Sequence, residues 1–349
     1  MTPFVLPPNT FDHFYRGGRH IAELRRSAPG AKRPEEWLGS VVSRFGESEL
    51  GLTGFAGHTL RAEIEANPVD WLGAAHLSRY GPSLGVLVKL LDPAQRLPVH
   101  LHPTRTFAAE HLDCPYGKTE AWVILETEPA GGDVFVGTHR AVAGEEWAAL
   151  VEAQDSDAML DLLRPITVRS GDAVLVPAGT PHAIGPDLLV LELQEPTDLS
   201  ILLEWRGFDI DGAAEGHLGL GFDVAIGAIR PDALGDDELE QLVARSVETP
   251  AQAPNSVVSV MPEGADPYFR AWAVDSITEV ELPAGFGVLL VTDGSGRLSH
   301  QSGSIDVERG TALVIPASAS PCRLVGRLTA YLSQPSAPDA PEPHEWDML

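Results

Sequence analysis

Two histidines one residue apart are the first sign of chemistry in this sequence. His100 and His102 occur in the segment Val-His-Leu-His-Pro. On an extended strand, alternate side chains point to the same face, so the two imidazoles would lie about 7 Å apart along the strand and face one point. Such a pair could bind a metal ion, although the same pattern also occurs on exposed strand faces.

Glu120 and His182 could complete a metal site with this pair. Glu120 opens the apolar run at residues 121–125, where an inward carboxylate is costly unless it is paired or bound to a cation. His182 ends the segment GDAVLVPAGTPH, in which Gly179 permits a tight turn that aims the imidazole inward. The simpler alternatives are a surface glutamate at a strand end and a hydrogen-bonded core histidine.

Taken together, the four residues predict a mononuclear metal site. Three imidazoles and one carboxylate suit zinc, and the same donors would accept manganese, iron, cobalt or nickel. We therefore expect one metal ion per chain, held by His100, His102, Glu120 and His182, and we choose Zn2+ although the ligand types alone do not select it.

Short strands separated by turns must position these residues. Apolar runs bounded by Gly and Pro predict strands at residues 84–91, 97–102, 121–125, 134–136, 166–168, 173–176 and 188–193. Periodic apolar residues predict helices at residues 60–80, with a break at Pro68, at 144–163 and at 236–247. The rhythm is typical of a β-sandwich or barrel with helical insertions.

One segment of the chain is repeated. Residues 171–182 align without gaps on residues 310–321 (GTALVIPASASP), which predicts two related β-barrels. Pro321 stands where the first copy has His182, so the second barrel should lack a metal. We expect a metal-binding domain with helical inserts at residues 1–250 and a metal-free domain at residues 251–349.

Charge and composition limit the partners. The chain has 50 acidic and 24 basic side chains and a formal net charge of −26. This charge would repel nucleic acid and anionic membrane surfaces, so we expect neither as a partner. Two cysteines are too few for a disulfide framework, and no apolar run is long enough to span a bilayer, which together favour a cytoplasmic protein. A small molecule is the expected ligand, and we make no prediction of the oligomeric state.

The order of several motifs resembles that of the type I mannose-6-phosphate isomerases, in particular the short bacterial form, which belong to the cupin superfamily. The matching stretches are residues 36–37, 87–92, 100–103, 117–122, 171–182 and 191–194. The resemblance covers nearly the whole chain and implies a mainly β fold of two cupin-type β-barrels (jelly rolls). It also implies a zinc site at His100, His102, Glu120 and His182, with His100 in place of a family glutamine.

The resemblance further implies an aldose–ketose isomerase that acts on mannose 6-phosphate, fructose 6-phosphate or a related sugar. Such an enzyme moves a proton between C1 and C2 through an enediol, which requires a polarised carbonyl and an acid/base group. Lys118, two residues before the ligand glutamate, and Glu192, on an apolar strand, are the candidates. A solvated lysine in a turn and an outward-facing glutamate are the alternatives.

One departure from the family bears on the substrate. The family has an arginine four residues after an aspartate. Here the residue four positions after Asp198 is Leu202. Arg206 is the nearest replacement, and an arginine in an exposed turn is an equally good interpretation.

The missing arginine and the His100 replacement leave a second function open, a non-catalytic sugar-binding or regulatory cupin. The histidine-rich ligand set would also fit an iron dioxygenase of the same superfamily. The Gly-Lys-Thr-Glu-x-Trp motif at residues 117–122 argues against that third possibility.

Overall fold

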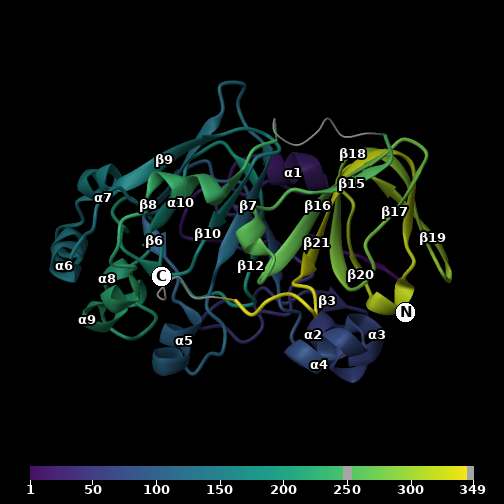
Figure 1. Ribbon diagram of the computed structural model, residues 1–349, viewed down its shortest axis with the longest axis horizontal. Coiled ribbons are helices and arrows are strands. Elements are labelled where there is room, and N and C mark those ends of the chain that lie inside the picture. The colour runs from purple at the N-terminus through teal and green to yellow at the C-terminus, as the bar shows by residue number, and fades with distance from the viewer. Residues whose placement is uncertain (247–253, 344–349) are drawn as a thin grey trace.

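The chain folds into two β units that lie side by side, with helices around their outer faces (Figure 1). The structure is a computed structural model, and it describes residues 1–246 and 254–343. The strand pairings in both units are antiparallel. The prediction of a mainly β, cupin-type fold with helical insertions is confirmed.

The first unit contains two sheets. The six-stranded sheet runs in the order β14 (Val243–Ala244), β10 (Ala173–Val176), β7 (Glu120–Glu126), β12 (Leu189–Gln194), β5 (Leu87–Leu91) and β2 (Glu35–Leu38). The five-stranded sheet runs in the order β13 (Ile201–Leu202), β6 (His100–Leu101), β11 (His182–Ile184), β8 (Gly132–Thr138) and β9 (Leu163–Val168). Residues of both sheets line one cavity, as expected of two facing sheets in a jelly roll.

Strand register places Lys89, Glu120 and Glu192 on one face of the six-stranded sheet, which we call the polar face. Leu191 pairs with Leu90 and Val123, and all three belong to a core that also contains Val288 and Val314 of the second unit. The residues between them therefore point to the other face, because strand side chains alternate. This polar face looks into the first unit.

The second unit is one eight-stranded sheet. Its main order is β1 (Phe4–Val5), β20 (Ala312–Ile315), β18 (Gly287–His300), β21 (Arg323–Pro335), β16 (Phe269–Ser276) and β15 (Ser256–Ser259), while β17 (Glu279–Glu281) pairs with β21 and β19 (Gly303–Glu308) pairs with β18. The N-terminal strand β1 therefore joins the sheet formed by the C-terminal part of the chain. The repeated segment forms matching strands, β10 and β20, as the alignment predicts. The predicted boundary between residues 250 and 251 lies outside the described residues, and the domain division stays a prediction.

Helices occur where the periodic residues predict them. The predicted helical region at residues 60–80 consists of α2 (Leu60–Ala66), α3 (Pro68–Leu72) and α4 (Ala74–Tyr80), and the first break falls at Pro68 as expected. The region at 144–163 contains α6 (Gly144–Ala153) and α7 (Ser156–Leu162). The third helix, α10 (Asp236–Gln241), is shorter than predicted because Val243 and Ala244 pair with β10 instead.

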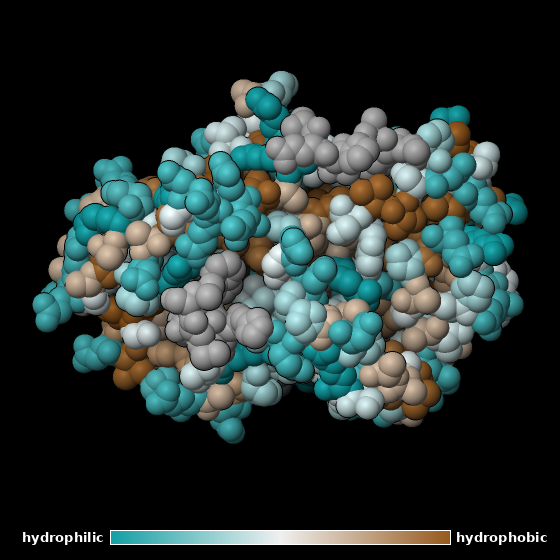
Figure 2. Space-filling model, viewed as in Figure 1, coloured by the Kyte–Doolittle hydropathy of each residue, from teal (hydrophilic) through white to brown (hydrophobic). Residues whose placement is uncertain are grey.

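The remaining elements are short. They are α1 (His20–Arg25), β3 (Gly54–Phe55), β4 (His58–Thr59), α5 (Arg105–Leu112), α8 (Gly212–Glu215), α9 (Phe222–Ala225), and the 3-10 turns η1 (Ile226–Ala228), η2 (Glu263–Ala265) and η3 (Ala317–Ala319). Within the described ranges, no helix is both long and apolar enough to cross a membrane. Hydrophilic side chains cover most of the face shown in Figure 2. Cys114 and Cys322 are both free, and the cytoplasmic location expected from the cysteine content stays a prediction.

A buried ion pair joins the two units near α1. The guanidinium of Arg25 donates to Glu36 Oε1 and Oε2 over 2.9 and 3.1 Å, and both side chains are nearly inaccessible. Arg25 also donates to the carbonyls of Leu6 and Gly310, so one side chain connects α1, β2 and the second sheet. Burial raises the pKa of Glu36, although Arg25 opposes this shift.

We predict that Arg25→Met lowers the free energy of unfolding by about 3–5 kcal/mol, because it leaves the Glu36 carboxylate buried without its partner. Urea denaturation measures this change. The double variant Arg25→Met/Glu36→Leu removes both charges and should recover much of the loss. A single-variant loss below about 1 kcal/mol would show that this pair does not hold the units together.

Candidate functional site

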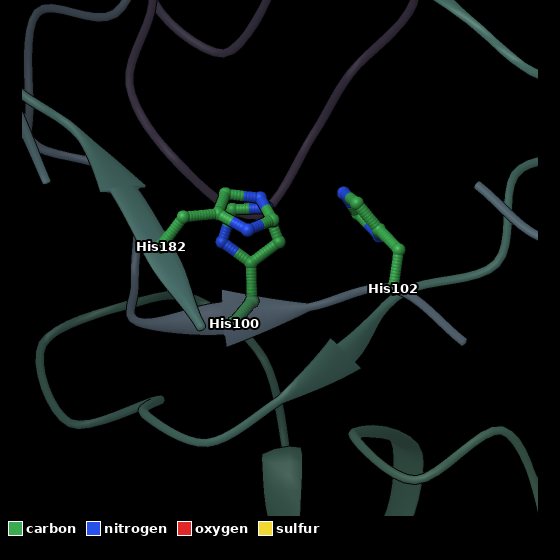
Figure 3. A group of neighbouring side chains, drawn as sticks. All are labelled: His100, His102 and His182. Atoms are coloured by element: carbon green, nitrogen blue, oxygen red, sulfur yellow. The ribbon is translucent and has the colours of Figure 1, made fainter. Parts of the chain in front are cut away.

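Three histidines from two neighbouring strands meet inside the first unit (Figure 3). His100 begins β6 and His182 begins β11, and the two residues are directly paired in the sheet. His102 lies just beyond the end of β6 and points its ring at the other two. A nitrogen from each ring lies within 4.8 Å of the others, and all three side chains are buried. The structure therefore brings together the three histidines that the spacing selected.

Backbone carbonyls orient the three rings. Nδ1 of His100 lies 2.8 Å from the carbonyl oxygen of Pro98, and Nδ1 of His102 lies 2.8 Å from that of Leu199. Nδ1 of His182 lies 2.8 Å from the carbonyl oxygen of Thr180. A carbonyl only accepts, so each Nδ1 carries the proton and each Nε2 keeps its lone pair. Among the described residues, Nε2 of His182 has no hydrogen-bond partner although it is fully buried. A buried acceptor without a donor beside two other imidazoles fits a site for a cation.

The protonation states also suit metal binding. Burial lowers the pKa of His100 well below its usual value, and the neighbouring His182 and His102 add to the shift. Burial likewise lowers the pKa of His102 to about 3, with a further contribution from the positive charge of Lys118. Both imidazoles are therefore neutral at pH 7, which is the form that coordinates a metal ion.

Glu120 adds a carboxylate at the edge of the histidine group. Its Oε2 lies 2.9 Å from Nε2 of His102, and its Oε1 lies 3.4 Å from Nε2 of His182. Nζ of Lys118 lies 2.6 Å from Oε2, and Nε1 of Trp122 donates to Oε1 over 2.9 Å. Burial acts to raise the pKa of Glu120, but Lys118 and His102 outweigh it and hold the pKa well below its usual value. The carboxylate is therefore ionised and touches two of the three histidines.

Lys118 and Glu192, the two predicted acid/base groups, face the same cavity as His100. The cavity has a volume of about 400 Å³, within the range of small-molecule sites. Lys118 is 4% exposed, so it is not a solvated lysine in a turn. Glu192 pairs with Lys89 and Trp122 on the neighbouring strands, so its side chain lies on the same face of the sheet as theirs. This is the face that looks into the first unit. Burial, and then the charge of Glu120, raises the pKa of Glu192 to about 8.

A cluster of ionisable residues beside Glu192 was missed by sequence reasoning. Nζ of Lys89 lies 3.6 Å from Glu35 Oε2, 3.7 Å from Glu192 Oε2 and 3.5 Å from Asp198 Oδ1. Tyr15 donates to Glu35 Oε1 over 2.7 Å. Burial acts to raise the pKa of Glu35, but His13, Lys89 and two hydrogen bonds outweigh it and lower the pKa to about 2. A lysine within the apolar run LVKLL was the available signal for this cluster.

Arg206 is not brought to the other predicted site residues. Its guanidinium donates to the carbonyl of Ala153 over 2.8 Å on the exposed side of the turn, and its backbone N–H donates to Gln154. In the part of the chain that the structure describes, Arg206 is not among the residues that line the cavity. Leu202, the residue four positions after Asp198, does line it.

The chain matches named sugar isomerases over most of its length. It is 27% identical over 323 residues to mannose-6-phosphate isomerase ManA of Bacillus subtilis, a match that covers 91% of this chain and 94% of that protein. It is 28% identical to mannose-6-phosphate isomerase of Streptococcus mutans, over 71% of this chain and 75% of that protein. No protein-family model matches the chain.

The chain is a relative of the mannose-6-phosphate isomerases. Solved structures of mannose-6-phosphate isomerases share its fold. The Bacillus subtilis enzyme superposes with a TM-score of 0.69 at 22% identity, covering 96% of this chain and 100% of that chain. An alanine mutant of phosphomannose isomerase from Salmonella typhimurium gives 0.71 at 17% identity, with the same two coverages.

We predict that the purified chain carries about one divalent transition-metal ion and that His182→Ala loses it, because the variant removes one of three converging imidazoles. Metal analysis by mass spectrometry checks this. His58→Ala, at a half-exposed histidine outside the site, is the matched control and should retain the metal. Equal metal content in His182→Ala and the unmodified chain would contradict the assignment.

Proposed function

We propose that the chain is a metal-dependent aldose–ketose isomerase that acts on mannose 6-phosphate or a related sugar by transfer of a proton through an enediol. The observation that carries the proposal is the shared cavity: two proton-transfer candidates, Lys118 and Glu192, line it together with a histidine of the candidate metal group. The relatives named mannose-6-phosphate isomerase support the choice of this reaction and this sugar.

The proposed cation is Zn2+, held by His100, His102, Glu120 and His182. When bound, such a cation supplies a Lewis acid that polarises a carbonyl oxygen. The donors, three imidazoles and one carboxylate, suit zinc and do not distinguish it from manganese, iron, cobalt or nickel. The carbonyls that accept from the three Nδ1 atoms keep the rings in place.

Glu192 is the proposed base. A carboxylate with a pKa near 8 is close to the working pH, so it can both take a proton and return it. Its position opposite Lys89, on the polar face of the sheet, holds it inside the cavity. Removing a proton from one of the two reacting carbons and returning it to the other is the task that the isomerisation requires.

Lys118 is the proposed partner for the sugar oxygens. Its ammonium lies 2.6 Å from Glu120 and 2.7 Å from Nε2 of His102, and the side chain is buried. A fixed donor at this position can stabilise negative charge that develops on an oxygen during proton transfer.

A non-catalytic sugar-binding cupin is the second candidate. The observation that favours it is Leu202, an apolar side chain that lines the cavity where the resembling family has an arginine. In that case the chain would bind a sugar saturably and convert none.

We predict that the chain interconverts mannose 6-phosphate and fructose 6-phosphate, and that a chelator abolishes this activity until a divalent metal is restored. A coupled assay over free and 6-phosphorylated sugars measures it. Metal-loaded protein that converts no sugar of this panel would remove the proposal and leave the sugar-binding cupin.

Glu192→Gln should lower kcat by about 100-fold or more while the fold is retained, because it removes the proposed base. A base is active only when ionised, so kcat/KM of the unmodified enzyme should fall as the pH drops below an inflection at or below about 8. Glu128→Gln, an exposed glutamate beyond the end of β7, is the control and should behave as the unmodified enzyme. Unchanged turnover in Glu192→Gln would rule out this role.

A further inference from the structure

The loop at residues 41–53 closes one side of the cavity. Arg44, Phe45 and Gly46 from this loop line the cavity together with Lys118 and Glu192. The loop is held in place by its backbone, because the N–H of Arg44 donates to the Leu50 carbonyl over 2.7 Å. It is also attached to the site, since the N–H of Phe45 donates to Asp198 Oδ2 over 3.1 Å.

The basic side chains that line the cavity differ in whether they contact a carboxylate. Lys89 lies within 3.7 Å of three carboxylates, and Lys118 lies 2.6 Å from Glu120. Arg44 lines the same cavity and is half-buried. Its guanidinium makes one long hydrogen bond of 3.4 Å, to the carbonyl of Asp12, and has no carboxylate partner among the described residues.

Acidic side chains that line the cavity determine how it would receive an anionic ligand. Glu35, Glu192, Asp198 and Glu215 also line the cavity. Those of them that are ionised would repel an anionic ligand unless a cation were available to it, and Glu192, with its pKa raised to about 8, contributes less negative charge at pH 7 than the others. Arg44 is the cavity cation whose charge is not already neutralised by a neighbouring carboxylate. A guanidinium presents paired N–H donors that match two phosphate oxygens, and a half-buried position strengthens such a contact relative to open solvent.

We propose that Arg44 binds the phosphate group of a phosphorylated sugar in this cavity and so makes the site selective for sugar phosphates over free sugars. The assignment rests on the proposed isomerase function for the identity of the sugar. Phe45 is 48% exposed beside it and supplies apolar surface next to the bound ligand. The backbone attachment of Phe45 to Asp198 fixes the distance between the phosphate end and the Lys89–Glu192 pair.

Calorimetric binding of mannitol 6-phosphate and of mannitol tests the assignment, because neither sugar alcohol has a carbonyl to isomerise. The unmodified full chain should bind the phosphate far more tightly than mannitol. Arg44→Gln should weaken binding of mannitol 6-phosphate by about tenfold or more and leave the binding of mannitol unchanged, since it removes a charged hydrogen-bond donor. Arg44→Lys keeps the charge and should recover part of the affinity.

Arg33→Gln is the matched control. Arg33 is an exposed arginine that contacts the carboxylate of the same Asp12 and, in the described chain, does not line the cavity. This variant should bind mannitol 6-phosphate as the unmodified chain does. Thermal unfolding at the same temperature for all variants would show that the loop substitutions leave the fold intact.

Two results would overturn the assignment. One is binding of mannitol 6-phosphate by Arg44→Gln with unchanged affinity, and the other is an unmodified chain without preference for the phosphate. The isomerase assay separates this failure from that of the proposed function. If binding depends on Arg44 but no sugar is converted, the isomerase proposal fails and the phosphate role of Arg44 stands. If Arg44→Gln converts mannose 6-phosphate with an unchanged KM, the phosphate role of Arg44 fails and the isomerase proposal stands.

Discussion

The polar face of the six-stranded sheet is the constraint on which the site depends. Lys89, Glu120 and Glu192 project from this face into a barrel, where an unpaired charge would cost several kcal/mol. Each of these charged groups lies close to a group of opposite charge, as Lys89 does to Glu192 and Lys118 to Glu120. The space around these pairs is therefore not filled by apolar side chains. The cavity between the two sheets follows from this arrangement, because groups that must stay hydrated or paired leave room for a ligand.

The two sheets contribute different chemistry. The five-stranded sheet and the residue that follows β6 supply three imidazoles whose Nδ1 atoms contact carbonyl oxygens, so that their ring nitrogens converge at one place. The six-stranded sheet supplies carboxylates and ammonium groups. An imidazole donor set beside ionised groups suits a cation on one wall and proton transfer on the other. The N-terminal segment adds a third wall, which carries Arg44.

Much of the barrel and the histidine group could be predicted from the sequence because both depend on local patterns. Strand alternation placed His100 and His102 on one side, and the Gly179 turn placed His182. The direction of Glu192 could not be predicted, since β12 is buried on both faces and its alternation does not say which face is inside. Register with Lys89 and Trp122 decides that question.

The residues that sequence reasoning missed come from segments placed by long-range pairing. His13, Tyr15, Glu35 and Arg44 reach the cavity because β2 pairs with β5, about 50 residues later in the chain. No local pattern encodes that pairing. Arg206 is close in sequence to the position of the missing arginine, yet its guanidinium contacts the carbonyl of Ala153 and not the cavity. Closeness in sequence therefore did not predict its place in the structure.

Hydrogen exchange at the sugar in heavy water shows whether the chain transfers a proton between C2 and C1. Metal-loaded chain is incubated with mannose 6-phosphate in deuterium oxide, and the sugar is followed by NMR. We predict that deuterium enters at C1 of the fructose 6-phosphate that forms, and at C2 of mannose 6-phosphate through the return reaction, because the base exchanges its proton with water between removal and return. A chain that binds the metal and the sugar phosphate but incorporates no deuterium and forms no ketose would not be an isomerase of this sugar.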